Sequence, residues 1–473
     1  MTPPITSNNF IPAARIALAD PTLQEAFTTG LRGVRANRLA AMNAFGAAHR
    51  EALRQQGAAA KRHALSRLPE LLEQAETRFR ENGAEVLWAV DGAQAGQYVL
   101  EIAARHGVRL VVKSKSMLTE EIGLNHMMEQ AGIETLETDL GEYIVQIEGG
   151  TPSHIVAPIM HKTKDSVRDL LIEKLDMPTT DVAEEMTKFV RGVLRPGFIN
   201  ADMGISGGNF VIAETGTVCL VTNEGNGRLS TGAPKVHIAL VGIEKIVATL
   251  EDYAALVQLL ARSSTGQQVS VYMQLINGPR RADEPDGPEH VYVIFVDNGR
   301  SQIYQTPYAE ALACLRCGAC LNNCPVYQSV GGHAYGSVYP GPIGSVLTPL
   351  LNGIENAAPL PYASSLCGQC KEVCPVDIDL PRMLLDLRRD LSARGKDGRV
   401  WALGLKGWAL LMASPALYRI GGKLAALATR LLPIRSLPGP LSGWTAHRVM
   451  PRFAAKSFRE QWNDRQKEAR DAR

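Results

Sequence analysis

Cysteines provide the clearest sign of chemistry in this 473-residue chain. Seven of the eight cysteines lie between Cys314 and Cys374, and Cys219 lies alone in an apolar run. The first four of the seven follow the spacing Cys314-x2-Cys317-x2-Cys320-x3-Cys324-Pro325. In proteins with two iron–sulfur clusters, this spacing places three thiolates around one corner of a cubane, and the fourth thiolate binds the neighbouring cluster. Soft thiolate ligands suit such clusters, so the run predicts iron–sulfur binding.

A second, shorter run repeats this pattern. It reads Cys367-x2-Cys370-x3-Cys374-Pro375, and Ser364 stands where its first cysteine would be. If the last cysteine of each run crosses to the other cluster, cluster one is bound by Cys314, Cys317, Cys320 and Cys374, and cluster two by Cys324, Cys367 and Cys370. Four thiolates predict a 4Fe–4S form for cluster one. Cluster two is either 4Fe–4S, completed by Ser364, water or a partner group, or 3Fe–4S.

Zinc binding, disulfides and an open catalytic iron agree less well with the cysteine pattern. A structural zinc site usually takes two separated pairs of ligands and has no need of the Cys-Pro step. Disulfides are rare in chains without a secretion signal, and Cys219 is interpreted as a small buried hydrophobe. Substrate binding at an open iron of cluster two would need acid–base groups, which the sequence does not identify. Two adjacent clusters therefore favour electron relay.

Composition and charge limit the class of protein. Hydrophobic residues make up 45% and charged residues 21%, which is typical of a folded globular chain. The net charge of +2 hides an asymmetry: from Arg382 onward there are 19 Lys/Arg and 7 Asp/Glu, whereas the preceding residues carry 31 and 41. The first ten residues lack the pattern of a signal peptide, and no apolar stretch of about 18 residues is present. We therefore expect a cytoplasmic protein that does not bind nucleic acid.

Four regions are expected to position the cysteines. They are a helical N-terminal extension (1–80), an α/β domain (81–303), an α-helical ferredoxin-type domain with two clusters (304–385) and a basic helical C-terminal region (386–473). In the first region, apolar residues at helical spacing predict helices with a break near Pro69. In the second, short strands and helices alternate, which predicts a parallel sheet. The predicted strands are 85–90, 109–113 and 134–138, and the predicted helices are 93–106, 119–130, 166–175 and 181–194.

Later segments of the chain have no such alternation. Five apolar runs are expected to extend the same sheet, namely 210–213, 218–222, 236–241, 269–276 and 291–296. The segment 325–363 joins the two cysteine runs and is rich in Gly and Pro. These residue types favour a structured loop over a helix.

Two loops of the α/β domain are rich in glycine and polar residues. They are Gly204-Ile-Ser-Gly-Gly-Asn209 and Asn223-Glu-Gly-Asn-Gly-Arg-Leu-Ser230. Glycine lets backbone amides approach a ligand at strand ends, and Glu214, between the loops, is the first acid to test. The alternative, which we favour, is that these glycines form tight turns between strands. The first loop does not precede a predicted helix, so we do not infer dinucleotide binding.

The C-terminal region is strongly basic, with ten Lys/Arg and no acidic residue between Gly398 and Arg459. Arg419, Lys423 and Arg430 fall on one face of a predicted helix. Such a helix could lie on an anionic membrane, where each basic residue contributes about 1 kcal/mol, close to a quinone or another membrane-bound acceptor. The alternative, which we favour, is packing on an acidic partner subunit or on the acidic body of this chain.

Taken together, the chain resembles the lactate-utilisation protein B family, the iron–sulfur subunit of a bacterial L-lactate oxidation system. The resemblance covers nearly the whole length. It is carried by segments 205–216, 314–327, 331–350 and 362–376 and by the tail Ala455-Lys-Ser-Phe-Arg-Glu-Gln-Trp462. It implies a transferase-like α/β lactate-utilisation domain, then a ferredoxin-type domain with two 4Fe–4S clusters ligated as above, then a helical C-terminal region.

The resemblance also implies a function. This is electron transport in the oxidation of L-lactate to pyruvate, as a subunit of a multi-protein L-lactate dehydrogenase system with companion lactate-utilisation subunits and an external electron acceptor. Membrane contact, if present, would be peripheral and at the inner face. No catalytic residue carries over, and Glu214 is not identified as one. Two alternatives stay open: an iron–sulfur subunit for another 2-hydroxy acid such as glycolate, and an iron–sulfur regulator whose α/β domain senses a small acid.

Overall fold

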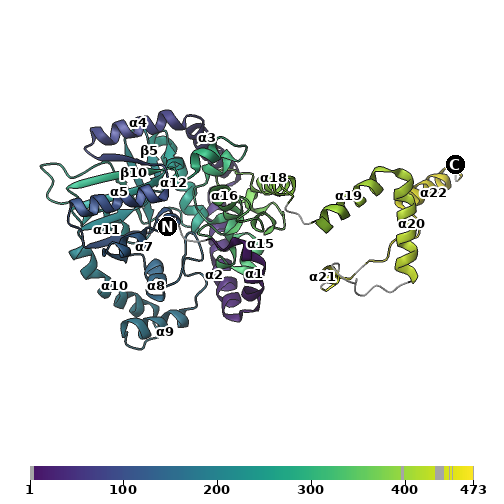
Figure 1. Ribbon diagram of the computed structural model, residues 1–473, viewed down its shortest axis with the longest axis horizontal. Coiled ribbons are helices and arrows are strands. Elements are labelled where there is room, and N and C mark those ends of the chain that lie inside the picture. Colours follow the sequence, from purple (N-terminus) through teal and green to yellow (C-terminus); the bar gives the residue numbers. More distant parts are fainter. Residues whose placement is uncertain (1–4, 396–398, 432–441, 447, 450, 472–473) are drawn as a thin grey trace. The chain divides into compact units, whose positions relative to one another are not determined.

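The computed structural model describes residues 5–395, 399–431, 442–446, 448–449 and 451–471. The chain divides into two compact units, residues 1–391 and 392–473. The first unit contains both β-sheets of the described residues (Figure 1), and all eight cysteines lie in it.

A six-stranded parallel sheet is the centre of the first unit. Its strand order is β1-β10-β7-β4-β2-β3, and every pair is parallel. The strands are β1 (Glu85–Ala89), β2 (Leu110–Lys113), β3 (Glu134–Glu137), β4 (Met203–Ser206), β7 (Val236–Gly242) and β10 (His290–Val296). The alternation of strands and helices thus correctly predicted a parallel sheet.

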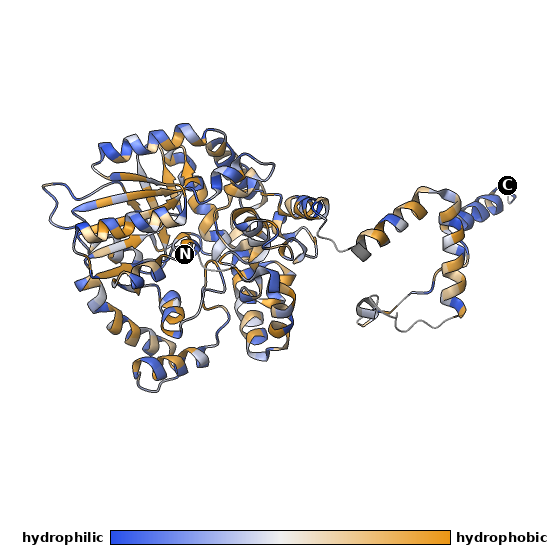
Figure 2. Ribbon diagram, in the orientation of Figure 1, coloured by the Kyte–Doolittle hydropathy of each residue, from blue (hydrophilic) through white to orange (hydrophobic). Residues whose placement is uncertain are grey.

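Both faces of this sheet are buried. Along β10, Val291, Val293 and Phe295 pack in one core and Tyr292 and Ile294 in the other. The first core includes helix α4 (Leu68–Glu81), and the second includes α5 (Gly92–Arg105). Burial on two faces explains why the central strands read as continuous apolar runs, and Figure 2 shows these strands in the hydrophobic colour.

Three of the expected sheet extensions form a separate sheet instead, so that prediction was wrong. The second sheet has the order β8-β5-β6-β9. Its strands are β5 (Phe210–Ile212), β6 (Thr217–Thr222), β8 (Ile246–Val247) and β9 (Tyr272–Ile276). Only the short turn 213–216 joins β5 to β6, and a parallel neighbour would need a long crossover. The pair is therefore antiparallel.

Several helices differ from their predicted bounds. The predicted helix 119–130 is two helices, α6 (Met117–Ile122) and α7 (Leu124–Gln130), because Gly123 has a φ of 69° and ends the first. Parts of both predicted glycine loops are regular structure, since β4 begins at Met203 and α11 covers Asn226–Gly232. The other crossover helices are α8 (Leu140–Glu148), α9 (Lys164–Leu175), α10 (Ala183–Asn200) and α12 (Leu250–Ser264).

The N-terminal segment is helical, as predicted. It forms α1 (Phe10–Ala19), α2 (Pro21–Asn43), α3 (Ala47–Ser66) and α4, and the break before α4 has Pro69 in the first turn. The first two helices pack on the cysteine-containing segment. The ring of Phe10, on α1, lies 5.2 Å from the ring of Tyr335, measured between centroids. The ring of Phe27, on α2, lies 5.6 Å from that of Tyr327.

The segment between the cysteine runs contains helices, so the expectation of a loop over 325–363 was wrong. It holds α15 (Pro325–Val330) and α16 (Gly341–Asn352). Pro325 and Pro342 each occupy a first helical turn, where the missing N–H has no intrahelical partner to lose. The cysteine runs on either side of this segment contain the short helices α14 (Ala319–Asn322) and α17 (Gln369–Glu372), and the longer α18 (Leu380–Ala393) follows the second run.

The second unit contains helices α19 (Arg399–Ala413), α20 (Pro415–Leu431), α21 (Ser442–Thr445) and α22 (Phe458–Asp471). Apolar side chains are exposed along α19 and α20, such as Trp408 (58%) and Leu424 (60%). Figure 2 colours much of these two helices as hydrophobic. Among the described residues, no helix is both long and apolar enough to cross a membrane.

Candidate iron–sulfur site

The two cysteine runs fold into loops of the same conformation. Arg316 and Leu366, which precede Cys317 and Cys367, have φ values of 60° and 55°. Positive φ is uncommon for residues other than glycine, and it recurs here at matching positions. Gly318 and Gly368 follow with φ values of 75° and 83°, and the short helices α14 and α17 come next. The second run is therefore a structural repeat of the first.

Four cysteines from both runs line one small cavity. They are Cys314, Cys317, Cys320 and Cys374, the set predicted for cluster one, and apolar side chains that include Ile155, Ile343, Val376 and Leu380 complete the wall. Burial raises the pKa of Cys317 to about 12 and that of Cys374 to about 11. Four thiols around an apolar cavity are the donor set that a cubane requires.

The other three cysteines form a second group. Burial, together with the thiolate charges of Cys324 and Cys367, raises the pKa of Cys370 to about 12. Burial raises the pKa of Cys324 as well, and Cys367 adds to that shift. Cys367 is exposed, whereas Cys324 and Cys370 are buried.

Ser364 occupies the place of Cys314 in the repeat. The N–H of Leu366 donates to Ser364 Oγ at 3.1 Å, and the N–H of Arg316 donates to Cys314 Sγ at 3.4 Å. In each run, the side chain thus accepts from the backbone two residues later. The serine hydroxyl replaces a thiol at the same position of the same loop.

Among the described residues, no three His, Cys, Asp or Glu side chains converge closely enough to hold a single metal ion.

Two arginines of the N-terminal helices fix the second cysteine run. Arg54, on α3, donates from Nε to the carbonyl of Cys374 at 2.8 Å, and its Nη2 lies 2.8 Å from Asp377. Arg38, on α2, donates to the carbonyl of Val373 at 2.8 Å. The sequence did not identify these residues, because basic residues on a helix usually indicate only a solvated face.

A buried charge network connects the first cysteine run with the α/β domain. Arg300 Nε lies 2.7 Å from Glu244 Oε2, and Arg300 Nη2 lies 2.8 Å from Glu121 Oε2. Although burial favours the neutral acid, Arg300 and other cations lower the pKa of Glu244 to about 2. Arg316, inside the cysteine run, lies 3.6 Å from Glu244 Oε1 and has its guanidinium 4.5 Å from the Tyr339 ring centroid.

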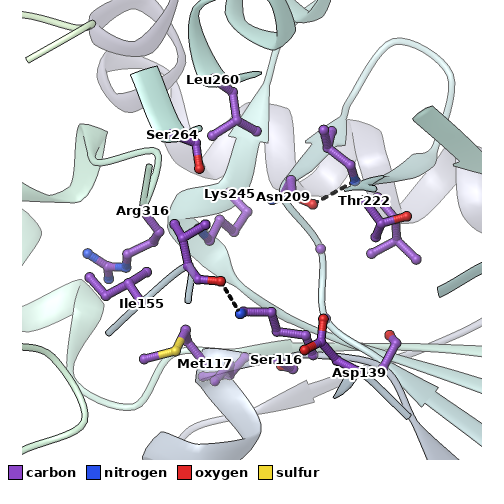
Figure 3. Close-up of a pocket in the computed structure, with 18 of the residues that line it drawn as sticks. Ser116, Met117, Asp139, Ile155, Asn209, Thr222, Lys245, Leu260, Ser264 and Arg316 are labelled. Atoms are coloured by element: carbon purple, nitrogen blue, oxygen red, sulfur yellow. Dashed lines mark hydrogen bonds between the residues drawn. The ribbon is translucent and has the colours of Figure 1, made fainter. Parts of the chain in front are cut away.

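A larger cavity of about 340 Å³ lies at the carboxyl ends of the parallel strands (Figure 3). Residues that directly follow β2, β4 and β7 line it, namely Ser114, Lys115, Ser116, Gly207, Gly208, Asn209, Glu244 and Lys245. From β2 the chain steps outward to β3 and then crosses to β4 on the other side of β2. Ligands of α/β proteins often bind at such a reversal of strand order.

The two glycine-rich loops meet at this cavity, but Glu214 does not. Glu214 is exposed and accepts the N–H of Leu250 at 3.0 Å. A Cβ at Gly207 would lie 2.8 Å from Ser116 Oγ, and one at Gly208 would lie 2.7 Å from Val241 Cγ1. Gly207 and Gly208 thus allow neighbouring side chains to pack closely against the backbone, and neither has a positive φ.

Three family models match separate parts of the chain. The LUD domain matches residues 72–296, and a 4Fe-4S dicluster domain matches residues 310–378. The model described as "Lactate utilisation protein B, C-terminal" matches residues 393–467. The chain therefore contains an N-terminal LUD domain with a parallel sheet, then a dicluster domain and this C-terminal domain.

Similar proteins extend over most of the chain. "Lactate utilization protein B" of Shouchella clausii is 46% identical over 86% of both chains, and that of Bacillus cytotoxicus is 42% identical over 99% of both. "Uncharacterized electron transport protein YkgF" of Escherichia coli is 41% identical over 96% of both.

A solved structure of a duf162 family protein from Deinococcus radiodurans covers 48% of this chain and 98% of its own, with 18% identity and a TM-score of 0.28. This likeness is too weak to support any conclusion. The identities and coverage given above show instead that the chain belongs to the lactate utilization protein B family.

Proposed function

We propose that this chain is an iron–sulfur electron-transfer protein in the oxidation of L-lactate to pyruvate. The observation that carries the proposal is the convergence of Cys314, Cys317, Cys320 and Cys374, from two separate runs, on one cavity. Relatives named for lactate utilisation and for electron transport support it. Electrons from lactate would pass through two clusters in series to an acceptor outside the chain.

The ligands that we propose are those of the crossed pattern. Cluster one takes Cys314, Cys317, Cys320 and Cys374, and cluster two takes Cys324, Cys367 and Cys370. A bound cluster would carry one electron at a time. Its reduction potential would depend on its burial and on hydrogen bonds to its sulfur ligands. Two such bonds come from backbone amides, Arg316 to Cys314 and Ile378 to Cys374, each at 3.4 Å.

The environments of the two groups suggest an order of electron flow. The cavity of cluster one shares Arg316 and Ile155 with the wall of the larger cavity in the α/β domain. The group of cluster two includes the exposed Cys367. We propose that electrons enter at cluster one and leave toward an acceptor from cluster two.

The domain limits that we propose are 1–80, 81–303, 304–385 and 386–473. Each of the last three contains most of one matched family model. Helices α1 to α3 of the first region pack on the cysteine-containing segment, so this extension supports the cluster site. A transferase-like fold of the α/β domain stays a prediction from the resemblance.

The partners that we propose are companion lactate-utilisation subunits and an external acceptor. The basic C-terminal unit is the candidate for such contacts, because its helices expose Trp408, Leu424 and other apolar side chains. We favour packing on an acidic protein surface. Peripheral membrane contact and the cytoplasmic location stay predictions.

The proposed function can be tested with anaerobically purified protein and its co-purifying chains. L-lactate is added, and the visible iron–sulfur absorption is followed with dithionite as the positive control. Bleaching by lactate is the expected result. Bleaching by glycolate but not by lactate would assign the chain to another 2-hydroxy acid.

Full bleaching by dithionite with no response to either acid, with all companions present, would contradict the proposal. In that case, growth on lactate of a strain from which the gene for this chain is deleted would favour the alternative of an iron–sulfur regulator that senses a small acid.

A further inference from the structure

The larger cavity of the α/β domain has no assigned ligand. Its volume of about 340 Å³ is within the range of small-molecule sites. Apolar side chains such as Met117, Leu240 and Leu260 and polar groups such as Asn209 and Ser264 line it together. This mixture of an apolar wall and a few polar groups is typical of sites for small organic ligands.

The side of this cavity near the cysteines is cationic. Arg300 and Arg316 line it, and both are paired: Arg300 with Glu121 at 2.8 Å and Glu244 at 2.7 Å, and Arg316 with Glu244 at 3.6 Å. Lys115 is also paired, because its Nζ lies 3.1 Å from Glu142 Oε1. Among the described residues that line the cavity, Lys245 is the cation without a hydrogen bond or an ion pair.

Lys245 cannot easily obtain a partner from the protein. The nearest acid in sequence is Glu244, and both of its oxygens are occupied by arginines. Burial is the main cause that lowers the pKa of Lys245, to about 8. Lys245 is only partly buried and lines the cavity, so its ammonium can meet an anionic ligand there, which would offset the cost of its partial desolvation.

The opposite side of the cavity carries two acids, and the charge of Lys115 acts on both of them. Asp139 and Glu224 line it, and Figure 3 shows Asp139 and Thr222 on the side away from Lys245 and Arg316. A ligand with one negative group can pair with Lys245 and leave its neutral part toward these acids. A second negative group would meet the carboxylates and would be repelled.

We propose that this cavity binds a small monocarboxylate, with the carboxylate on the Lys245 ammonium next to the site of cluster one. The inference deepens the proposed function, on which it rests for the choice of acids. It places the organic acid in the α/β domain of this chain, beside the first of the two clusters. Dicarboxylates are disfavoured by Asp139 and Glu224.

The test is isothermal titration calorimetry on the anaerobic holoprotein with L-lactate, pyruvate and the dicarboxylate L-malate. The variants are Lys245→Met and the control Lys235→Met, whose lysine is exposed before the amino end of β7, at the opposite edge of the sheet. We expect Lys245→Met to weaken binding of L-lactate or pyruvate about tenfold or more, as for loss of a charged hydrogen bond. The Lys235→Met variant should bind the monocarboxylates with the affinity of the wild type. L-malate should bind to the wild type no more tightly than L-lactate binds to Lys245→Met.

Iron content and bleaching by dithionite check that each protein is intact, and Lys245→Gln replaces Lys245→Met if the latter loses iron. The inference would be overturned if the intact wild type bound neither monocarboxylate. It would also be overturned if the Lys245 variants bound L-lactate as tightly as the wild type, or if L-malate bound to the wild type as tightly as L-lactate. Reduction of the clusters by lactate and companions without such binding would leave the proposed function standing. Binding of the monocarboxylates without reduction of the clusters in the complete system would support the inference about the cavity and contradict the proposed function.

Discussion

Cys317 lies in the wall of the cavity that is lined by the four cysteines of cluster one. We expect Cys317→Ser to remove cluster one and roughly half of the bound iron, because an alkoxide is a poor substitute for a thiolate on iron. The two cores on the faces of the parallel sheet contain no cysteine of either run, so the parallel sheet should stay folded. Iron analysis and circular dichroism measure the two effects.

Cys219→Ala is the matched control, because Cys219 is buried in β6 and lies outside both cysteine groups. It should keep the iron content of the wild type. Full iron content in Cys317→Ser would refute the ligand assignment.

Ser364 holds the position that Cys314 has in the first run. If its hydroxyl completes cluster two, Ser364→Ala should change the electron paramagnetic resonance spectrum of that cluster and leave cluster one unchanged. Ser364→Cys should instead produce a stable cluster with four thiolates. An unchanged spectrum in Ser364→Ala would exclude the serine as a ligand.

At the scale of elements, the parallel core was predictable and the second sheet was not. Strands β7 and β10 have long apolar runs, because both of their faces are buried. Strands β5 and β6 have similar runs, so composition alone could not assign them to a different sheet. The four-residue connection between them was the available signal, since it is too short for a parallel crossover.

The ion network between the α/β domain and the first cysteine run should be important for stability. Arg300→Met would leave Glu121 and Glu244 buried without their main partner, and both are under 10% exposed. Loss of one member of a buried network typically costs about 3–5 kcal/mol. We expect a clear fall in the urea midpoint, measured by tryptophan fluorescence.

Arg80→Met is the control for this experiment. Arg80 pairs with Glu76 at 2.7 Å on the surface, and a surface pair contributes at most about 1 kcal/mol. If the two substitutions lower the midpoint equally, the buried network has no special role.

At the scale of the whole molecule, the sequence predicted the local cysteine motifs but not the residues that support them. The spacing of a motif is local, so its ligands can be read directly. Arg54 and Cys374 are 320 positions apart, and their contact depends on the packing of α3 against a distant loop. The same is true of Lys245, whose unpaired state depends on which arginines reach Glu244.

The basic C-terminal unit should determine association with partners. We expect the triple change Arg419→Glu, Lys423→Glu and Arg430→Glu on α20 to weaken co-purification of the companion subunits, because it reverses the charge that attracts an acidic surface. The interaction of the unchanged protein should weaken with salt. Size-exclusion chromatography measures both effects.

The control reverses three basic residues that are exposed on α10 at spacings of three and four, namely Lys188, Arg191 and Arg195. It should leave co-purification intact. Flotation with anionic vesicles separates the two interpretations of the tail: loss of vesicle binding by the α20 variant, with companions still bound, would favour the membrane.

The repeat of the cysteine loops has a consequence for the origin of this site. Two runs with the same sequence of backbone conformations, from Ser364 and Cys314 through to Pro375 and Pro325, are most simply explained by duplication of one ancestral half. The two halves now differ at matching positions: Ser364 stands where the first run has Cys314, and Leu366 stands where it has Arg316. One half now carries the arginine that contacts Glu244 of the α/β domain, and the other carries a serine in place of a thiol, so the two halves of the repeat are no longer equivalent.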